Sequence, residues 1–137
     1  MGQKVNPIGY RLGVNKTWDS RWYANKKDFG TTLNKDLKIR EYLKKHLKDA
    51  AVASIIIERK KNRCEVTINT AKPGVIIGRG GEDIDKLRKA LSREVKEDVY
   101  VSIVDVSKQA DLNAQLVADN IAMQIENRAP FRSAQKR

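Results

Sequence analysis

A glycine-rich segment between two patterned stretches most restricts the folds open to this chain. It reads Pro73-Gly-Val-Ile-Ile-Gly-Arg-Gly-Gly-Glu-Asp-Ile84, so that apolar residues lead into three glycines and a helical pattern follows. Glycines lack a Cβ atom, which lets a ligand backbone come very close. The first N–H groups of the following helix have no partners within it and carry the positive end of its dipole. The segment therefore predicts a loop that binds a phosphate-bearing ligand.

Three kinds of phosphate-binding loop compete for this segment. A Walker loop requires Gly-Lys-Ser or Gly-Lys-Thr, and the chain contains neither tripeptide. The dinucleotide fingerprint G-x-G-x-x-G fails because its last position, counted from Gly78, is Asp83. The G-x-x-G loop of a KH domain fits Gly78-Arg79-Gly80-Gly81. Since G-x-x-G alone is a weak pattern, a simple tight turn between two helices is the alternative.

Hydrophobic periodicity supplies the context that favours the KH loop. It predicts an amphipathic helix over 34–48, a strand-rich hairpin, a second helix over 82–96, a strand over 99–106 and a last helix over about 111–127. The hairpin strands are Val52–Arg59 and the alternating 64–69, which a turn of Lys60-Lys61-Asn62-Arg63 joins. Asn34 and Asp111 are the expected N-caps of the first and last helices.

The order of these elements predicts an α+β fold. An extra helix and strand precede the strand, the G-x-x-G helix pair and the final strand, as in a type II (prokaryotic) KH domain. We expect its helices to pack on one face of a three-stranded sheet. Cys64 falls on the apolar face of its strand, which predicts a buried, inert thiol.

The positive charge indicates a polyanionic partner. The net charge is +11 over 137 residues, and it divides into +4 for 1–32, +5 for 33–107 and +2 for 108–137. We interpret these segments as a basic arm, the KH domain and the start of a truncated C-terminal domain. The arm holds five of the eight aromatic residues, which either stack on RNA bases or pack on protein. Packing is the favoured interpretation for Trp18 and Trp22.

Composition argues against several other functions. The chain has no apolar run of about 18 residues, and its N-terminus has no secretory signal. The one cysteine suits a reducing cytoplasm. The one histidine, His46, lies in a basic amphipathic helix, where a structural or surface role is expected. We therefore predict no catalytic site, no metal, no cofactor, no small-molecule substrate and no membrane partner.

Several blocks of the sequence resemble bacterial small ribosomal subunit protein three. They are the opening Met1–Gly13, Trp22-Tyr23-Ala24, Asp36–Arg40, Thr70–Gly74 and Leu116–Ile121. The resemblance runs over the whole chain. It implies a cytoplasmic, ribosome-associated structural protein of the small-subunit head that binds ribosomal RNA. It also implies a place beside small-subunit proteins ten and fourteen and beside the messenger RNA entry region.

The candidate RNA-binding residues are those of the loop and basic residues of the resembling segments. They are Lys4, Arg11, Lys72, Gly78, Arg79, Gly80, Gly81, Lys86, Arg132, Lys136 and Arg137. The last three resemble a messenger-facing basic cluster. Two departures concern that cluster, because Ser133 stands where the family often has a second arginine, and the family continues into a further α/β domain. A free-standing KH-type RNA regulator or chaperone is the alternative function.

Overall fold

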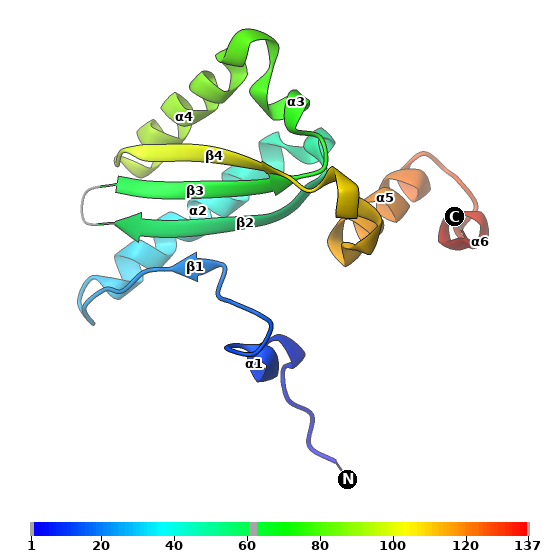
Figure 1. The fold of residues 1–137 in the computed structure, drawn as a ribbon, viewed down its shortest axis with the longest axis horizontal. Helices are drawn as coiled ribbons and strands as arrows, with labels where there is room; N and C mark the ends of the chain where they lie inside the picture. Colours follow the sequence, from blue (N-terminus) through cyan, green and yellow to red (C-terminus); the bar gives the residue numbers. More distant parts are fainter. Residues whose placement is uncertain (1, 61–62, 137) are drawn as a thin grey trace.

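A four-stranded sheet carries the core of the protein (Figure 1). The structure, a computed structural model, describes residues 2–60 and 63–136. The sheet order is β1 (Ser20–Arg21), β2 (Val52–Lys60), β3 (Arg63–Thr70) and β4 (Val99–Asp105). β2 and β3 form an antiparallel hairpin, whereas β1 pairs with β2, and β4 with β3, in parallel.

The helices fall into two groups around this sheet. α2 (Phe29–His46) and α4 (Glu82–Val95) cover one face, and the short α3 (Pro73–Ile77) lies at the end of β3 (Figure 1). The remaining helices, α1 (Pro7–Arg11), α5 (Ala114–Glu126) and α6 (Phe131–Lys136), extend away from the sheet. Three 3₁₀ turns are described as well: η1 (Lys48–Ala50), η2 (Arg79–Gly81) and η3 (Ser107–Leu112).

The hydrophobic core lies between the sheet and the helices α2 and α4. Along β3, buried residues alternate with partly exposed ones, as the period of two predicts for a strand with one covered face. The buried side chains come from both layers: Ile39, Leu43, Ile55, Ile57, Cys64, Val66, Ile68, Ile76, Leu91, Val95 and Val99. The expected α+β class is therefore confirmed, and Cys64 is buried as predicted.

The sheet has one strand more than the three that the sequence predicts. β1 comes from the segment interpreted as an arm, and its Ser20 pairs with Ile57 at the edge of β2. Arg40 on α2 fixes this edge, because its guanidinium donates to the carbonyl oxygens of Asp19 (3.0 Å) and Ile55 (2.6 Å). A strand of two residues is too short to show an alternating pattern. The hydrogen bonds from Arg40 that hold it cannot be read from the sequence of the strand either.

Two expected helix starts are wrong. α2 begins at Phe29 rather than at Asn34, and the hydroxyl groups of Thr31 and Thr32 donate to the carbonyl oxygen of Asp28 in its first turn. α5 is capped by Asn113, whose side chain accepts a hydrogen bond from the Gln115 N–H (3.0 Å), and Asp111 lies in η3. In the predicted hairpin turn, Lys61 and Asn62 lie outside the described residues, while Lys60 pairs with Arg63.

A charged network lies at the margin of the core. Asp36 on α2 is 1% exposed and accepts from Arg59 (2.7 Å) and from the Trp22 indole (2.6 Å). Arg59 also donates to Glu97, which Lys35 bonds on its other side. Burial lowers the pKa of Arg59, but its hydrogen bonds to the two carboxylates outweigh this, so the pKa is raised overall. The network joins the arm, α2, β2 and the turn before β4.

Candidate nucleic-acid interface

The glycine loop connects α3 to α4 through three glycines with positive φ. The φ angles are 69° at Gly78, 67° at Gly80 and 85° at Gly81, a region that side-chain-bearing residues rarely adopt. A Cβ atom added to Gly80 or Gly81 would meet nothing within 4 Å. The backbone of the loop therefore faces open space, and a phosphate backbone can approach it closely.

Position 78 requires glycine for a different structural reason, which is the space available beside it. A Cβ atom at this position would lie 2.8 Å from the Cβ of Asp83 and closer still to its carboxylate. The first turn of α4 thus packs directly against the Gly78 backbone. This contact fixes the angle at which α4 leaves the loop, and with it the direction of the helix N-terminus.

The charge around the loop is mixed. The first turn of α4 holds Glu82, Asp83 and Asp85, which suit the positive end of the helix dipole. Lys86 lies 3.4 Å from Asp83 and 3.7 Å from Glu82, and its side chain is 71% exposed. Exposed ion pairs of this kind contribute less than about 1 kcal/mol, so Lys86 can exchange one for a phosphate. Arg79, at the tip of the loop, is exposed.

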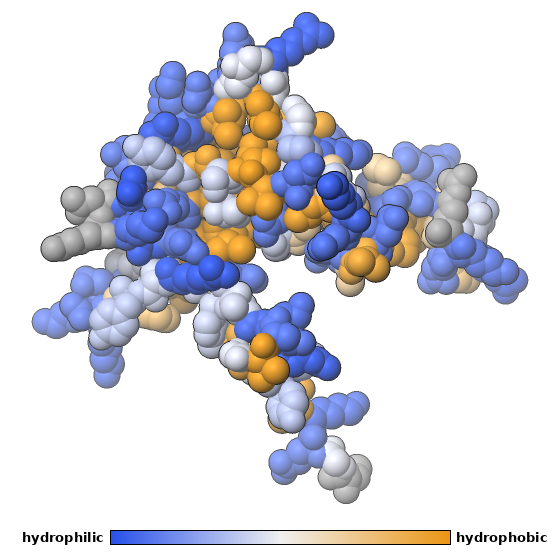
Figure 2. All heavy atoms as spheres, in the orientation of Figure 1, coloured by the Kyte–Doolittle hydropathy of each residue, from blue (hydrophilic) through white to orange (hydrophobic). Residues whose placement is uncertain are grey.

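An apolar surface adjoins the loop. Figure 2 shows hydrophobic side chains gathered between β4 and the helices α3 and α4. Leu87, Val101 and Ile103 are half-buried and pack on the core, and Ile77 at the end of α3 is 39% exposed. The strand β4 is an edge of the sheet, so this surface is open on the side that faces away from β3. Such a surface accommodates unstacked bases beside a backbone held at the loop.

A second depression lies among α2, α3 and α4. It measures about 330 Å³, and its lining includes Tyr42, His46, Val75 and Leu87. His46 is exposed and its ring centroid lies 4.2 Å from that of Tyr42, in agreement with the surface role expected for it. The described residues hold no cluster of three or more His, Cys, Asp or Glu side chains that could share a metal ion.

The thiol of Cys64 is buried and is mainly in its protonated, unreactive form. Burial raises the pKa of this thiol from 9.0 to about 11, and the Arg59 guanidinium opposes the shift only in part. Because the thiolate is the reactive form, the thiol is unreactive near neutral pH.

The aromatic residues of the arm divide between packing and exposure. Trp22 is half-buried, donates a hydrogen bond to Asp36 and packs against Phe29 with tilted rings whose centroids are 5.4 Å apart, so the packing interpretation is confirmed for it. Trp18, by contrast, is 69% exposed, so the packing expected of it is not found among the described residues. Tyr10 and Tyr23 are also exposed. These exposed rings lie on the same segment as Arg11.

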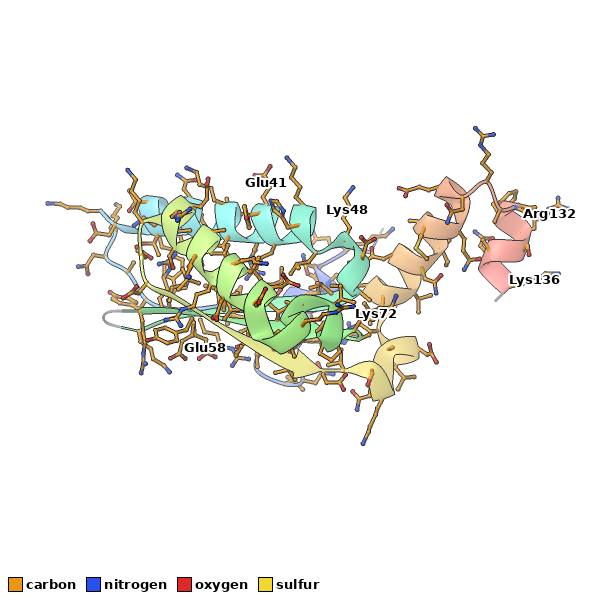
Figure 3. The ribbon with its side chains drawn as sticks, turned by 90° about the horizontal axis from the view of Figure 1, so that it is seen from above. Glu41, Lys48, Glu58, Lys72, Arg132 and Lys136 are labelled. Atoms are coloured by element: carbon orange, nitrogen blue, oxygen red, sulfur yellow. The ribbon has the colours of Figure 1, made fainter. Side chains whose placement is uncertain are left out.

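The predicted RNA-binding residues fall into three separate groups. The loop residues and Lys86 lie around the start of α4, and Lys72 lies at the other end of the short α3. Lys4 and Arg11 lie on the arm, whose helix α1 is far from α3 and α4 (Figure 1). Arg132 and Lys136 lie on α6 and are exposed, at the opposite end of the molecule from α2's first turn (Figure 3). Arg137 lies outside the described residues.

One cluster beside the loop is not predicted from the sequence. Tyr100 on β4 has the guanidinium carbon of Arg88 4.3 Å and that of Arg63 5.6 Å from its ring centroid. The three residues come from α4, β3 and β4, so only the packing of these elements brings them together. The one signal available in the sequence is an aromatic residue at an outward position of an alternating strand.

A comparison with known families identifies the central part of the chain. The sequence pattern of the KH domain matches residues 38–110, which is more than half of the chain. The chain belongs to the KH domain family. The type II KH fold expected from the order of elements is thereby confirmed, and the glycine loop lies within the matched residues.

Curated relatives extend the similarity over the whole chain. The chain is 56% identical over 137 residues to small ribosomal subunit protein uS3 of Beijerinckia indica, and 57% identical over 136 residues to that of Bacillus anthracis. It covers 56% and 61% of the lengths of these two proteins. The protein of the same name from Azorhizobium caulinodans is 56% identical over 131 residues, which are 52% of its length. The expected resemblance to this ribosomal family is confirmed, and the chain spans somewhat more than half of each relative.

Proposed function

We propose that this chain is a structural, non-enzymatic RNA-binding part of a small ribosomal subunit protein. The observation that carries this proposal is the open glycine loop ahead of α4, whose Gly80 and Gly81 have nothing within 4 Å of an added Cβ. The relatives that bear the name small ribosomal subunit protein uS3 support the ribosomal assignment. Cytoplasmic, ribosome-associated localisation follows from the same proposal. Among the described residues, no helix has the length and apolar character needed to cross a membrane.

In this proposal, the KH domain binds RNA mainly because the RNA backbone fits closely against the glycine loop. Backbone N–H groups at the start of α4 face a phosphate, while Arg79 and Lys72 supply cations. Bases lie along the apolar surface between α4 and β4. Because the first turn of α4 is acidic, the interaction depends on close backbone approach and not on accumulated positive charge.

The finer parts of the proposal concern the rest of the chain. We propose that 1–32 is an arm that contacts ribosomal RNA through Lys4 and Arg11, and that 33–107 is the KH domain. We further propose that 108–137 begins a C-terminal domain whose Arg132, Lys136 and Arg137 face messenger RNA at its entry region. Small-subunit proteins ten and fourteen are the proposed neighbours in the head of the subunit.

The loop is tested with the double variant Arg79→Asp/Gly80→Asp. Aspartate tolerates the positive φ of Gly80 better than most residues, so the fold is retained. We expect the affinity for single-stranded RNA to fall at least about tenfold, since a charge-assisted contact is replaced by repulsion. The slope of log affinity against log salt should shrink by about 0.7 for each phosphate that the variant no longer neutralises.

The matched control is Lys27→Asp/Gly30→Asp, which changes the net charge equally. Both positions lie at the start of α2, away from the glycine loop, and Gly30 has no neighbour within 4 Å of an added Cβ (Figure 1). Equal losses of affinity in the two double variants would contradict the loop assignment. Sedimentation of cell extracts tests the ribosomal assignment separately. Absence of the protein from small-subunit fractions would instead support a free-standing RNA regulator.

A further inference from the structure

An exposed tyrosine with two arginines lies on the strand that borders the KH groove. Tyr100 is 44% exposed, and the guanidinium carbons of Arg88 and Arg63 lie within 6 Å of its ring centroid. These distances are typical of cation–π contacts, which orient guanidinium groups beside an aromatic ring. The ring is therefore held in place by its neighbours while a large part of its surface remains accessible.

The cluster lies at the edge strand β4, beside the apolar surface that adjoins the glycine loop. Arg88 lies on α4 and Tyr100 on β4, the two elements between which the apolar surface lies. Because side chains alternate along a strand, Tyr100 is on the sheet face opposite Val101, and Arg88 reaches its ring around the edge strand β4. Arg88 lies seven positions after Gly81, which places its backbone about 10 Å along α4 from the loop, at 1.5 Å of rise per residue. A nucleic-acid strand that crosses the loop, follows α4 and passes over the edge strand β4 reaches this cluster.

The electrostatic surroundings of Tyr100 favour a nucleic acid. Glu65, which pairs with Tyr100 across the strands, is bonded by Lys60 at 2.6 Å and by Arg63 at 3.4 Å. The hydrogen bond from Lys60 lowers the pKa of the Glu65 carboxyl, so it stays ionised and paired. Within the described residues, Arg88 makes no ion pair. Positive charge therefore exceeds negative charge around the ring.

We propose that Tyr100, Arg88 and Arg63 form a stacking platform for one base of a single-stranded RNA whose backbone crosses the glycine loop. The Tyr100 ring supplies the stacking surface, and the two guanidinium groups hold the ring and attract the phosphates that flank the base. Because every base has a π-face, the platform accepts any of the four bases. This proposal rests on the proposed RNA-binding function of the KH loop and extends it by one subsite.

The test measures binding of fluorescent uridine oligonucleotides of four and ten residues to the 137-residue chain. We expect Tyr100→Leu to bind the ten-residue RNA about 5- to 100-fold more weakly than the unchanged protein, as for the loss of one stacked base. Tyr100→Phe keeps the ring and should bind normally. Arg88→Gln should weaken binding more than Lys89→Gln, its neighbour of equal charge on α4. The four-residue RNA, if held at the loop, should respond little to any of these changes.

A second measurement separates a binding role from a folding role. RNA that carries 4-thiouridine is irradiated on the protein, and the crosslinked peptide is identified by mass spectrometry. A crosslink at the peptide that contains Tyr100 supports the platform if it is absent in the Tyr100→Leu variant. The variant must have the same melting temperature as the unchanged protein, which shows that it is folded. Unchanged affinity of Tyr100→Leu for the ten-residue RNA, together with loss of binding in Arg79→Asp/Gly80→Asp, would overturn the platform alone. Absence of RNA binding in the unchanged protein would overturn the proposed function itself.

Discussion

Gly78 is held by two independent constraints, its backbone conformation and its contact with Asp83. Its φ of 69° and ψ of −172° lie in a region that essentially only glycine occupies. An added Cβ would also lie 2.8 Å from that of Asp83. We predict that Gly78→Ala lowers the free energy of unfolding by about 1–3 kcal/mol or more. Urea denaturation followed by tryptophan fluorescence measures this loss.

The matched control for Gly78 is Gly80→Asn. Gly80 also has a positive φ, but an added Cβ there would meet nothing within 4 Å, and asparagine tolerates this conformation. The control should therefore be less destabilised than Gly78→Ala. A comparable loss in both variants would contradict the prediction that the backbone conformation of Gly78 and its contact with Asp83 make it the more constrained position.

At the scale of single elements, α5 depends on its N-cap. The Asn113 side chain accepts from the Gln115 N–H, and Leu116 is the one residue of this helix that is buried within the described part of the chain. We predict that Asn113→Ala costs about 1 kcal/mol of local stability, since an N–H group loses its partner. Hydrogen exchange should accelerate in α5 but not in β3. Asn113→Asp keeps the acceptor and should leave the exchange rates of α5 nearly unchanged.

The same scale shows why the sequence predicts some elements and not others. β3 and α4 have strong two- and 3.6-residue periods because each has one covered face, so their bounds could be predicted closely. The start of α2 could not, because its first turn is fully exposed apart from Thr32 and carries no apolar stripe. β1 has two residues and depends on hydrogen bonds from Arg40, 19 positions after Arg21, which no local pattern reveals.

The candidate site divides in a similar way. The glycine loop could be predicted because its conformation requires glycine, and that requirement is visible in the sequence. The contact of Gly78 with Asp83 and the cluster around Tyr100 could not, since both arise from how α3, α4 and β4 pack. The carboxylate partners of Lys86 are readable from the sequence, by contrast, because Glu82 and Asp83 stand four and three positions before it on one helix.

At the scale of the whole molecule, the Asp36–Arg59–Glu97 network joins the arm to the KH domain. Asp36→Ala would leave the Arg59 guanidinium, whose side chain is 12% exposed, with one carboxylate instead of two. We predict a loss of about 1–3 kcal/mol in the free energy of unfolding, because buried donors lose an acceptor while Arg59 keeps its pair with Glu97. The Trp22 indole also loses its acceptor, so its fluorescence should report release of the arm at lower urea concentrations than unfolding of the sheet.

Glu58→Ala is the matched control for this network. Glu58 pairs with Arg21 at 3.0 Å between β2 and the arm, but both side chains are more than one-third exposed. Its removal should change stability by less than about 1 kcal/mol. If both variants were equally mild, the buried network would not be what fastens the arm.

The short parallel pairing of β1 with β2 determines whether the edge of β2 is open to a second copy of the chain. Without it, β2 would present the unpaired backbone of Ile55-Ile56-Ile57, a β-branched run on an open sheet edge. Such an edge is a template on which a second copy can add a strand. The Ile57 N–H is instead engaged by the carbonyl oxygen of Asp19 at 2.8 Å. Asp19 and β1 thus cover the edge at which a second copy could add a strand, so we expect a chain without this pairing to self-associate more readily.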